Sequence, residues 1–188
     1  LQAIKAVYDQ AKFREVISKT KKLLEKFPRS AVVWNIQGAS LSELAKFDEA
    51  INSFREAIKI NPGYADAHNN MGCAYRENRD SMLAIDCFRQ ALSLNKRHAD
   101  AMRNLGEMHF ENREYDASHR CFESLIFSGQ LASDNPLCQE IRAKSIECLL
   151  HLNRIDEFNN KVASIACLKE TNIRVAAISA YASRKLGQ

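Results

Sequence analysis

The sequence contains few residues that interrupt helices, with six glycines and three prolines among 188 residues. It has no apolar run near the roughly 18 residues that a membrane-spanning helix needs, and no hydrophobic signal segment opens it. Its 46% hydrophobic and 27% charged residues fit a soluble helical domain. These absences argue against a membrane span and favour an all-α fold.

Motifs for catalysis and cofactor binding are also missing. The sequence contains no H-E-x-x-H, G-x-S-x-G or G-x-G-x-x-G motif and no Walker-type phosphate loop. None of its six cysteines forms a C-x-x-C pair, and no histidine stands at zinc-finger spacing from such a pair. We therefore predict no catalytic residue, no metal site and no cofactor within this chain.

What the sequence does contain is a repeat of 34 residues. The residues that recur in register are Gly38, Gly72 and Gly106, then Ala50, Ala84 and Ser118, then Phe54, Phe88 and Phe122. A period of this length indicates stacked helical hairpins. Two helices can cross closely only where neither carries a bulky side chain, and we expect the phenylalanine to fill the groove beside each crossing.

This pattern resembles the tetratricopeptide repeat, whose consensus reads Trp, Leu, Gly, Tyr, Ala, Phe, Ala and Pro. Residues 31–64 depart from it clearly only at Gln37 and conservatively at Leu41. Their matching residues are Trp34, Gly38, Ala50, Phe54, Ala57 and Pro62. The resemblance implies an all-α, right-handed superhelical solenoid of antiparallel helix hairpins, with about five repeats and a C-terminal capping helix.

We predict that residues 1–188 form a single array. Its parts are a truncated repeat (1–30), three clear repeats (31–64, 65–98 and 99–132), an insertion (133–138), a degenerate repeat (139–172) and a capping helix (173–188). The second helix of the truncated repeat, near Phe13 to Lys26, has an apolar face that includes Leu24 and Phe27. Because its first helix starts abruptly at Leu1, we expect the chain to be a piece of a longer protein.

The cysteines and histidines fit a packing role. Cys87 and Cys121 occupy the same repeat position, next to the core phenylalanines. We interpret the cysteines as buried or half-buried apolar residues in a reducing compartment, and we expect a cytoplasmic protein. His68 and His109 replace consensus aromatic residues, so we expect their rings to pack between helices.

In tetratricopeptide arrays the first helix of each hairpin lines a concave groove. The residues at the implied groove positions include eight acidic ones (Glu43, Asp66, Glu77, Asp100, Glu107, Glu111, Glu140 and Glu147) and three basic ones (Arg76, Arg103 and Lys144). Two interpretations of this acidic lining stay open. It is a solvated surface that keeps the protein soluble, or it selects a partner segment that carries lysine or arginine.

Asparagines give a second candidate feature of the groove. Asn70 and Asn104 occupy equivalent positions, Asn69 lies beside the first, and Asn35 stands one position early in its repeat. An amide both donates and accepts, so a column of amides can bind the backbone of an extended peptide. The arrangement resembles the asparagine ladder of O-linked N-acetylglucosamine transferases, in which such residues hold peptide backbone. The predicted groove residues are Asn35, Asn69, Asn70, Arg103, Asn104, Glu107, Asp66, Asp100 and Arg76.

These features favour a protein-interaction scaffold that binds an extended peptide in its concave groove. The alternative is the non-catalytic N-terminal region of a larger transferase, serving substrate recruitment or oligomerisation. That alternative follows from runs such as LLEKFP, FDEAI and AHNN, which look like the repeats that precede bacterial sulfotransferase or glycosyltransferase domains.

Other features of the sequence suggest two further kinds of partner. The basic first hairpin, with Lys19, Lys21, Lys22 and Lys26, offers a docking face for nucleic acid or another anionic surface. No aromatic residue interleaves these lysines, so an exposed helix face is the better interpretation and we expect no nucleic-acid partner. A homodimer through exposed terminal hairpins is a separate expectation, because the ends of an array leave apolar faces uncovered.

Overall fold

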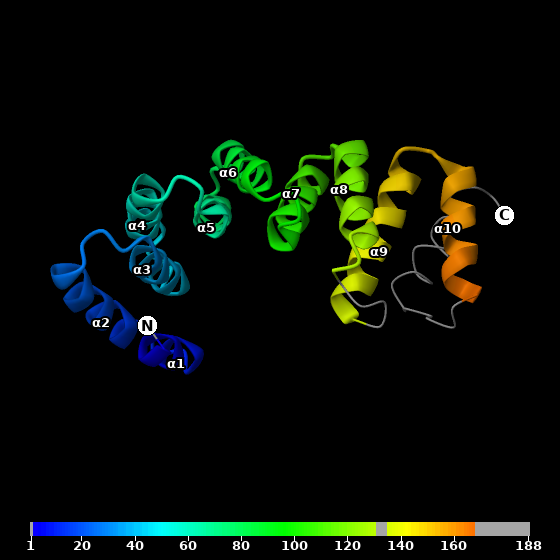
Figure 1. Ribbon diagram of the computed structural model, residues 1–188. Helices are drawn as coiled ribbons and strands as arrows, with labels where there is room; N and C mark the ends of the chain where they lie inside the picture. Colours follow the sequence, from blue (N-terminus) through cyan, green and yellow to red (C-terminus); the bar gives the residue numbers. More distant parts are fainter. Residues whose placement is uncertain (1, 131–134, 168–188) are drawn as a thin grey trace. The chain divides into compact units, whose positions relative to one another are not determined.

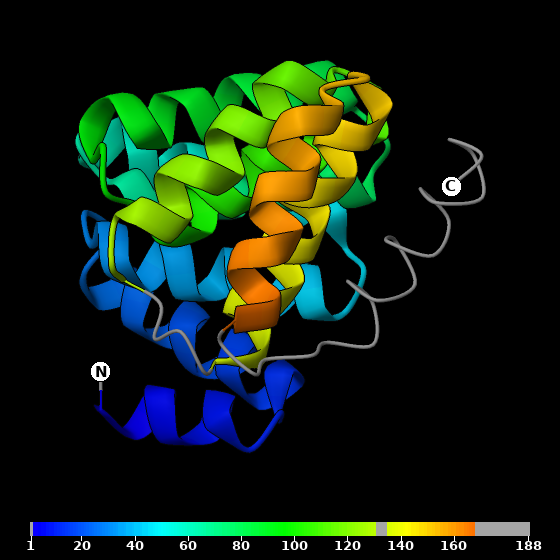
Figure 2. The ribbon, with the colours of Figure 1, turned by 90° about the vertical axis from the view of Figure 1, so that its right-hand side faces the viewer.

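The computed structural model describes residues 2–130 and 135–167, which form ten α-helices. The helices are α1 (Gln2–Asp9), α2 (Phe13–Lys26), α3 (Ala31–Glu43), α4 (Phe47–Ile60), α5 (Ala65–Glu77), α6 (Ser81–Leu94), α7 (Ala99–Glu111), α8 (Tyr115–Phe127), α9 (Pro136–His151) and α10 (Ile155–Cys167). They follow one another as consecutive hairpins (Figure 1), and a second view shows the same order (Figure 2). The prediction of an all-α array of helix hairpins is confirmed.

The chain divides into two compact units, Leu1–Ala101 and Met102–Gln188, and the boundary falls within α7. In the first unit α3 packs against α2, α4 and α5. In the second unit α9 packs against α8 and α10. The limits of the individual repeats stay predictions, and the predicted capping helix at 173–188 lies outside the described residues.

The turn inside each hairpin contains one residue in the left-handed conformation. These residues are Ala11, Ala45, Arg79, Arg113 and Asn153, with φ between 55° and 67°. In the second hairpin, the Lys46 amide donates to the Leu41 carbonyl across 2.9 Å. In the third hairpin, the Asp80 amide donates to the Tyr75 carbonyl across the same distance. This bond pattern is the Schellman motif, which satisfies the last carbonyls of a helix and stops it sharply. The second helix of each hairpin therefore starts at an equivalent place.

The helix crossings are as close as the repeat pattern predicts. A Cβ atom added to Gly38 or Gly72 would lie 2.6 Å from Cε1 of Phe54 or Phe88, and one added to Gly106 would lie 2.7 Å from Cε1 of Phe122. The three rings are at most 1% exposed. In each of these three hairpins the core is therefore a phenylalanine ring packed against the backbone of the facing helix, as expected.

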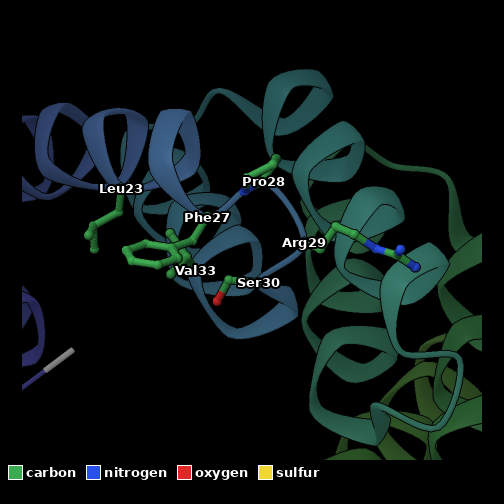
Figure 3. Close-up of a pocket in the computed structure, with 6 residues that line it drawn as sticks. All are labelled: Leu23, Phe27, Pro28, Arg29, Ser30 and Val33. Atoms are coloured by element: carbon green, nitrogen blue, oxygen red, sulfur yellow. The ribbon is translucent and has the colours of Figure 1, made fainter.

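The structure corrects one expectation about α2. Val16 and Leu24 are buried, but Phe27 is 61% exposed. Phe27 follows the last helical residue with φ −132°, so it has left the helical path before it could join the apolar face of α2. Its ring instead lines an open groove together with Leu23 and Val33 (Figure 3).

None of the helices within the two described stretches has the length and apolar character of a bilayer span.

Candidate functional site

Four polar side chains of the first unit form a hydrogen-bonded chain that joins α3 to α5. Asn70 donates from Nδ2 to Oδ1 of Asn35 across 3.1 Å, and Asn35 donates from its own Nδ2 to the Tyr64 hydroxyl across 3.4 Å. Asn69 donates to Oδ1 of Asn70 across 3.4 Å. We name Tyr64, Asn35, Asn70 and Asn69 the amide cluster. It forms because α3 and α5 are neighbours in the stack.

The amide cluster has hydrogen-bonding capacity beyond these internal bonds. A primary amide carries two N–H donors and an oxygen with two lone pairs. The bonds within the cluster use one donor and one lone pair each on Asn35 and on Asn70. Both side chains are half-buried, whereas Asn69 is 7% exposed. Asn35 and Asn70 are therefore the members that an external backbone can reach, already oriented by their neighbours.

Asp66 stands beside the amide cluster and is itself tied to the next hairpin. Its Oδ1 lies 3.0 Å from Nε2 of His98, and the Ala101 amide donates to Nδ1 of His98 across 3.3 Å. Since Nδ1 accepts, Nε2 carries the proton and donates to Asp66. Burial, and then the negative charge of Asp66, raise the pKa of Tyr64, so its hydroxyl keeps its proton. The cluster is thus neutral and lies next to an exposed carboxylate.

Two other predicted residues of the first unit lie on exposed or half-buried surface. Arg76 has its guanidinium 3.5 Å from Glu77, its neighbour in sequence. Asp100 is exposed in the first turn of α7.

The remaining predicted residues belong to the second unit, where an ion-pair group reduces the acidic character of the lining. Lys144 Nζ lies 3.1 Å from Glu107 and 3.3 Å from Glu140, and its side chain is only 18% exposed. Asn104 is 3% exposed and Arg103 is half-buried. Within the first unit Asn70 bonds to Asn35, and the ladder formed by Asn70 and Asn104 stays a prediction.

Sequence reasoning missed Tyr64 and His98, although one signal could have identified them. The two residues are 34 positions apart and each stands just before the first helix of a hairpin. A polar aromatic residue there reaches back to the preceding hairpin, to Asn35 from Tyr64 and to Asp66 from His98. The period showed their equivalence but not the reach of their side chains.

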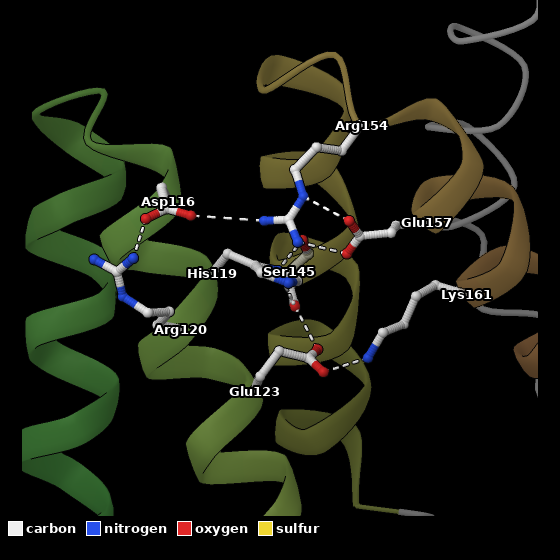
Figure 4. Close-up of polar contacts among 8 residues, drawn as sticks. All are labelled: Asp116, His119, Arg120, Glu123, Ser145, Arg154, Glu157 and Lys161. Carbon is white, nitrogen blue, oxygen red and sulfur yellow. Dashed lines mark hydrogen bonds and ion pairs between the residues drawn. The ribbon is translucent and has the colours of Figure 1, made fainter.

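The second unit holds a larger polar group between α8, α9 and α10 (Figure 4). Ser145 donates from Oγ to Glu123 across 2.7 Å and lies 2.9 Å from Nδ1 of His119. Lys161 of α10 pairs with the other oxygen of Glu123. Burial opposes ionisation of Glu123, but the bonds from Lys161 and Ser145 outweigh it and lower the pKa of this carboxyl.

This serine does not have the arrangement of a nucleophile. Ser145 is 2% exposed, and its proton points to a carboxylate rather than to the histidine. Around it, Arg154 pairs with Glu157 and also approaches Asp116 at 3.6 Å. The group therefore fastens α10 to α8 and α9 through charged hydrogen bonds.

Five cysteines are free thiols, and they are buried or half-buried as expected: Cys73, Cys87, Cys121, Cys138 and Cys148. Burial, with a smaller contribution from the charge of Asp86, raises the pKa of Cys87 to about 11. Burial likewise raises the pKa of Cys148 to about 11. Such thiols are poor nucleophiles at neutral pH. No group of three or more potential metal ligands occurs within residues 2–130 and 135–167.

Two family descriptions match the chain. The description "TPR repeat" matches residues 41–78, and "Tetratricopeptide repeat" matches residues 69–119. Residues 41–119 therefore carry tetratricopeptide repeats, as their pattern predicts. The similarity to repeats that precede transferase domains stays a prediction. No curated protein gave a significant match to the sequence.

Solved structures of similar fold include MamA, which is 21% identical, with 84% of this chain and 89% of that chain covered and a TM-score of 0.71. A structure of PilF from Pseudomonas aeruginosa is 16% identical, with 95% of this chain and 79% of that chain covered and a TM-score of 0.74. MamA from Desulfovibrio magneticus RS-1, from its residue 41 to its end, is 17% identical over 70% of this chain and 75% of that chain, with a TM-score of 0.63. At these identities the likeness shows the fold alone.

Proposed function

We propose that this protein, a tetratricopeptide-repeat protein, is an interaction scaffold that binds an extended peptide segment of a partner across α3 and α5. The observation that carries the proposal is the amide cluster, in which Asn35 and Asn70 are half-exposed and hydrogen-bonded to each other. An extended backbone offers alternating N–H and C=O groups, and each amide can match one of either kind. The expected affinity comes mainly from the peptide backbone.

The charges around the amide cluster favour a partner segment with lysine or arginine. Asp66 is 66% exposed in its side chain, and Glu43 is exposed at the end of α3. Exposed carboxylates speed the encounter with a basic segment and disfavour acidic competitors. In the second unit Lys144 offsets Glu107 and Glu140, so the preference for basic residues belongs to the α3 and α5 surface. We also propose a cytoplasmic location, as the free thiols suggest.

The test begins with a peptide selected from a displayed random library on the intact chain and made synthetically. Binding is measured by fluorescence anisotropy with the parent protein, Asn35→Ala, Asn70→Ala and the control Asn112→Ala, which removes an exposed asparagine of the second unit. We expect the two cluster variants to bind about five- to tenfold more weakly and the control to bind normally. Circular dichroism checks that helicity is unchanged.

A second arm separates backbone recognition from side-chain recognition. The selected peptide is remade with single N-methylated residues, each of which removes one backbone N–H. We expect N-methylation at one or two central residues to abolish binding, while substitution of the same side chains by alanine is tolerated. Binding that survives every N-methylation, or that Asn70→Ala leaves intact, would overturn the proposal.

A further inference from the structure

The open groove between the end of α2 and the start of α3 is a second feature of the first unit. It is lined by Leu23, Phe27, Pro28, Arg29, Ser30 and Val33 and has a volume of about 670 Å³. Phe27 and Val33 approach each other across it, whereas the guanidinium of Arg29 points away (Figure 3). Nε1 of Trp34 donates to the Pro28 carbonyl across 3.0 Å, which fixes the turn. The groove is therefore apolar and held in shape.

The first junction between hairpins differs from the next two at Ser30, one of the residues that line the groove. The position of Ser30 is occupied 34 residues later by Tyr64 and then by His98, two rings that reach back to the preceding hairpin. A small residue at this place leaves the space of a ring unfilled. The missing side chain is the size and kind of group that a ligand could supply.

At Phe27 the first junction has a larger and more apolar residue than the later junctions. The two equivalent residues are Asn61 and Asn95, whose side chains accept hydrogen bonds from the Gly63 and Arg97 amides across 3.2 and 3.0 Å. These bonds fasten the turns after α4 and α6. At the first junction the turn has instead a phenylalanine that is 61% exposed. An exposed ring that replaces a turn-forming amide next to an apolar groove is the mark of a contact surface.

The electrostatics of the groove favour negative charge. The helices α5 and α7 carry Asp66 and Asp100 in their first turns, but the equivalent residue of α3 is Val32, which is 43% exposed. Ser30 precedes α3 without a side-chain capping bond. The N-terminus of α3 therefore has no negative charge of its own to match its helix dipole.

Lysines add to this preference along one side of the groove. At about 100° per residue, Lys19, Lys22 and Lys26 all lie on the same side of Leu23 around α2. Lys22 and Lys26 are exposed and have no ion-pair partner among the residues that the structure describes, while Lys19 pairs with Glu15 at 2.8 Å. The acidic Glu25 lies on a different side of the helix.

We propose that this groove binds an acidic peptide segment of a partner protein, anchored by one large apolar side chain. The anchor enters between Phe27 and Val33, beside Ser30, the position at which the following junctions carry Tyr64 and His98. The flanking carboxylates face the start of α3 and the two unpaired lysines. The partner thus supplies both the ring and the acid that the later junctions carry in their own chain. This site is separate from the amide cluster and takes a segment of opposite charge.

The experiment uses the intact chain and a pool of short synthetic peptides with a phenylalanine or leucine among aspartates and glutamates. A matched pool has lysine in place of the acids. Anisotropy of labelled peptides reports binding, and the fluorescence of Trp34, the single tryptophan, reports the groove because its indole is bonded to Pro28. We expect binding of acidic peptides only, weakened by added salt.

Five variants locate the site. Ser30→Tyr restores the ring of the next junction and should abolish binding, whereas Ser30→Ala should not. Phe27→Asn should weaken binding about tenfold or more, as loss of a central anchor does. Met82→Asp is the control and should bind normally. Like Phe27→Asn, it replaces an exposed apolar residue with the polar residue found at the equivalent position of other repeats. Asn70→Ala should bind normally as well.

Three results would overturn the proposal. The first is that no acidic peptide binds, or that Ser30→Tyr still binds. The second is that single-stranded DNA or vesicles with anionic lipid bind the groove and the peptides do not, since then the lysines serve another ligand. The third is that sedimentation shows a dimer that Ser30→Tyr dissociates, since then a second copy of this chain fills the groove.

Discussion

Substitution of Gly38 by alanine tests whether the close helix crossing holds the first unit together. The new Cβ would lie 2.6, 2.8 and 2.9 Å from three ring carbons of Phe54. The ring cannot retreat, because Phe54 is 1% exposed and both Ala50 and Ala57 are fully buried around it. Such overpacking costs about 1–3 kcal/mol, and three contacts shorter than 3.0 Å put this site in the upper part of that range, at about 2–3 kcal/mol. Alanine regains roughly 1 kcal/mol of helix propensity over glycine, so we expect a net loss of about 1–2 kcal/mol.

Thermal and urea unfolding measure this loss. Circular dichroism follows all the helices, and Trp34 fluorescence follows α3, because the sequence has a single tryptophan. We expect the melting temperature of the first unit to fall by about 4–8 °C for each kcal/mol lost. Gly63→Ala is the matched control: its Cβ would meet nothing nearer than Oδ1 of Asn61 at 3.6 Å, so its stability should stay within about 0.5 kcal/mol of the parent.

A double-mutant cycle with Phe54→Leu identifies the cause. Leucine removes the ring atoms that the new Cβ would meet, so Gly38→Ala should cost less in the Phe54→Leu background, with a coupling of about 0.5–3 kcal/mol. The reasoning is refuted if Gly38→Ala leaves stability unchanged or raises it. It is also refuted if the cost is the same in both backgrounds, because the ring would then not be the obstacle.

Two predictions concern the second unit. The pKa of Glu123 is lower in the folded chain than its usual value of about 4.3. Its ionised form therefore stabilises the fold above that usual value, and the contribution is lost as the pH falls through the lower folded value. Glu123→Gln should cost about 1–2 kcal/mol near pH 7 and flatten the acid limb of the stability profile; an unchanged profile would contradict the role of the Lys161 bond. Cys148, fully buried and with a pKa of about 11, should resist iodoacetamide in the native protein at pH 8, whereas half-buried Cys121 should react first. Peptide mass spectrometry measures both, and equal rates would contradict the prediction.

Much of the fold could be predicted because the repeat places small and large residues at fixed intervals. Gly38, Gly72 and Gly106 indicated the crossings, and the spacing around Phe13 to Lys26 indicated α2 with its observed bounds. The apolar character of Phe27 misled the same reasoning. A helical period says where a residue would point if the helix continued, and α2 ends one residue earlier.

The candidate site could be predicted only in part. The sequence identified Asn35, Asn69 and Asn70 as candidates and placed Asn70 in register with Asn104, but it did not predict a bond between Asn70 and Asn35. The observed bond between Asn70 and Asn35 depends on how far two side chains reach between α3 and α5, which the period does not report. For the same reason the sequence did not predict that Lys144 pairs with Glu107, although it assigned both residues to the groove.

Both candidate sites depend on α3, and this decides how their variants are interpreted. Asn35 joins the amide cluster, while Val33, two residues earlier, lines the groove toward α2. Residues two apart on a helix point about 200° apart, so the sites lie on different sides of α3. A core change such as Gly38→Ala moves the helix and should weaken both. Ser30→Tyr and Asn70→Ala each alter one side only, so a variant of this kind that loses both binding activities has lost its fold rather than its site.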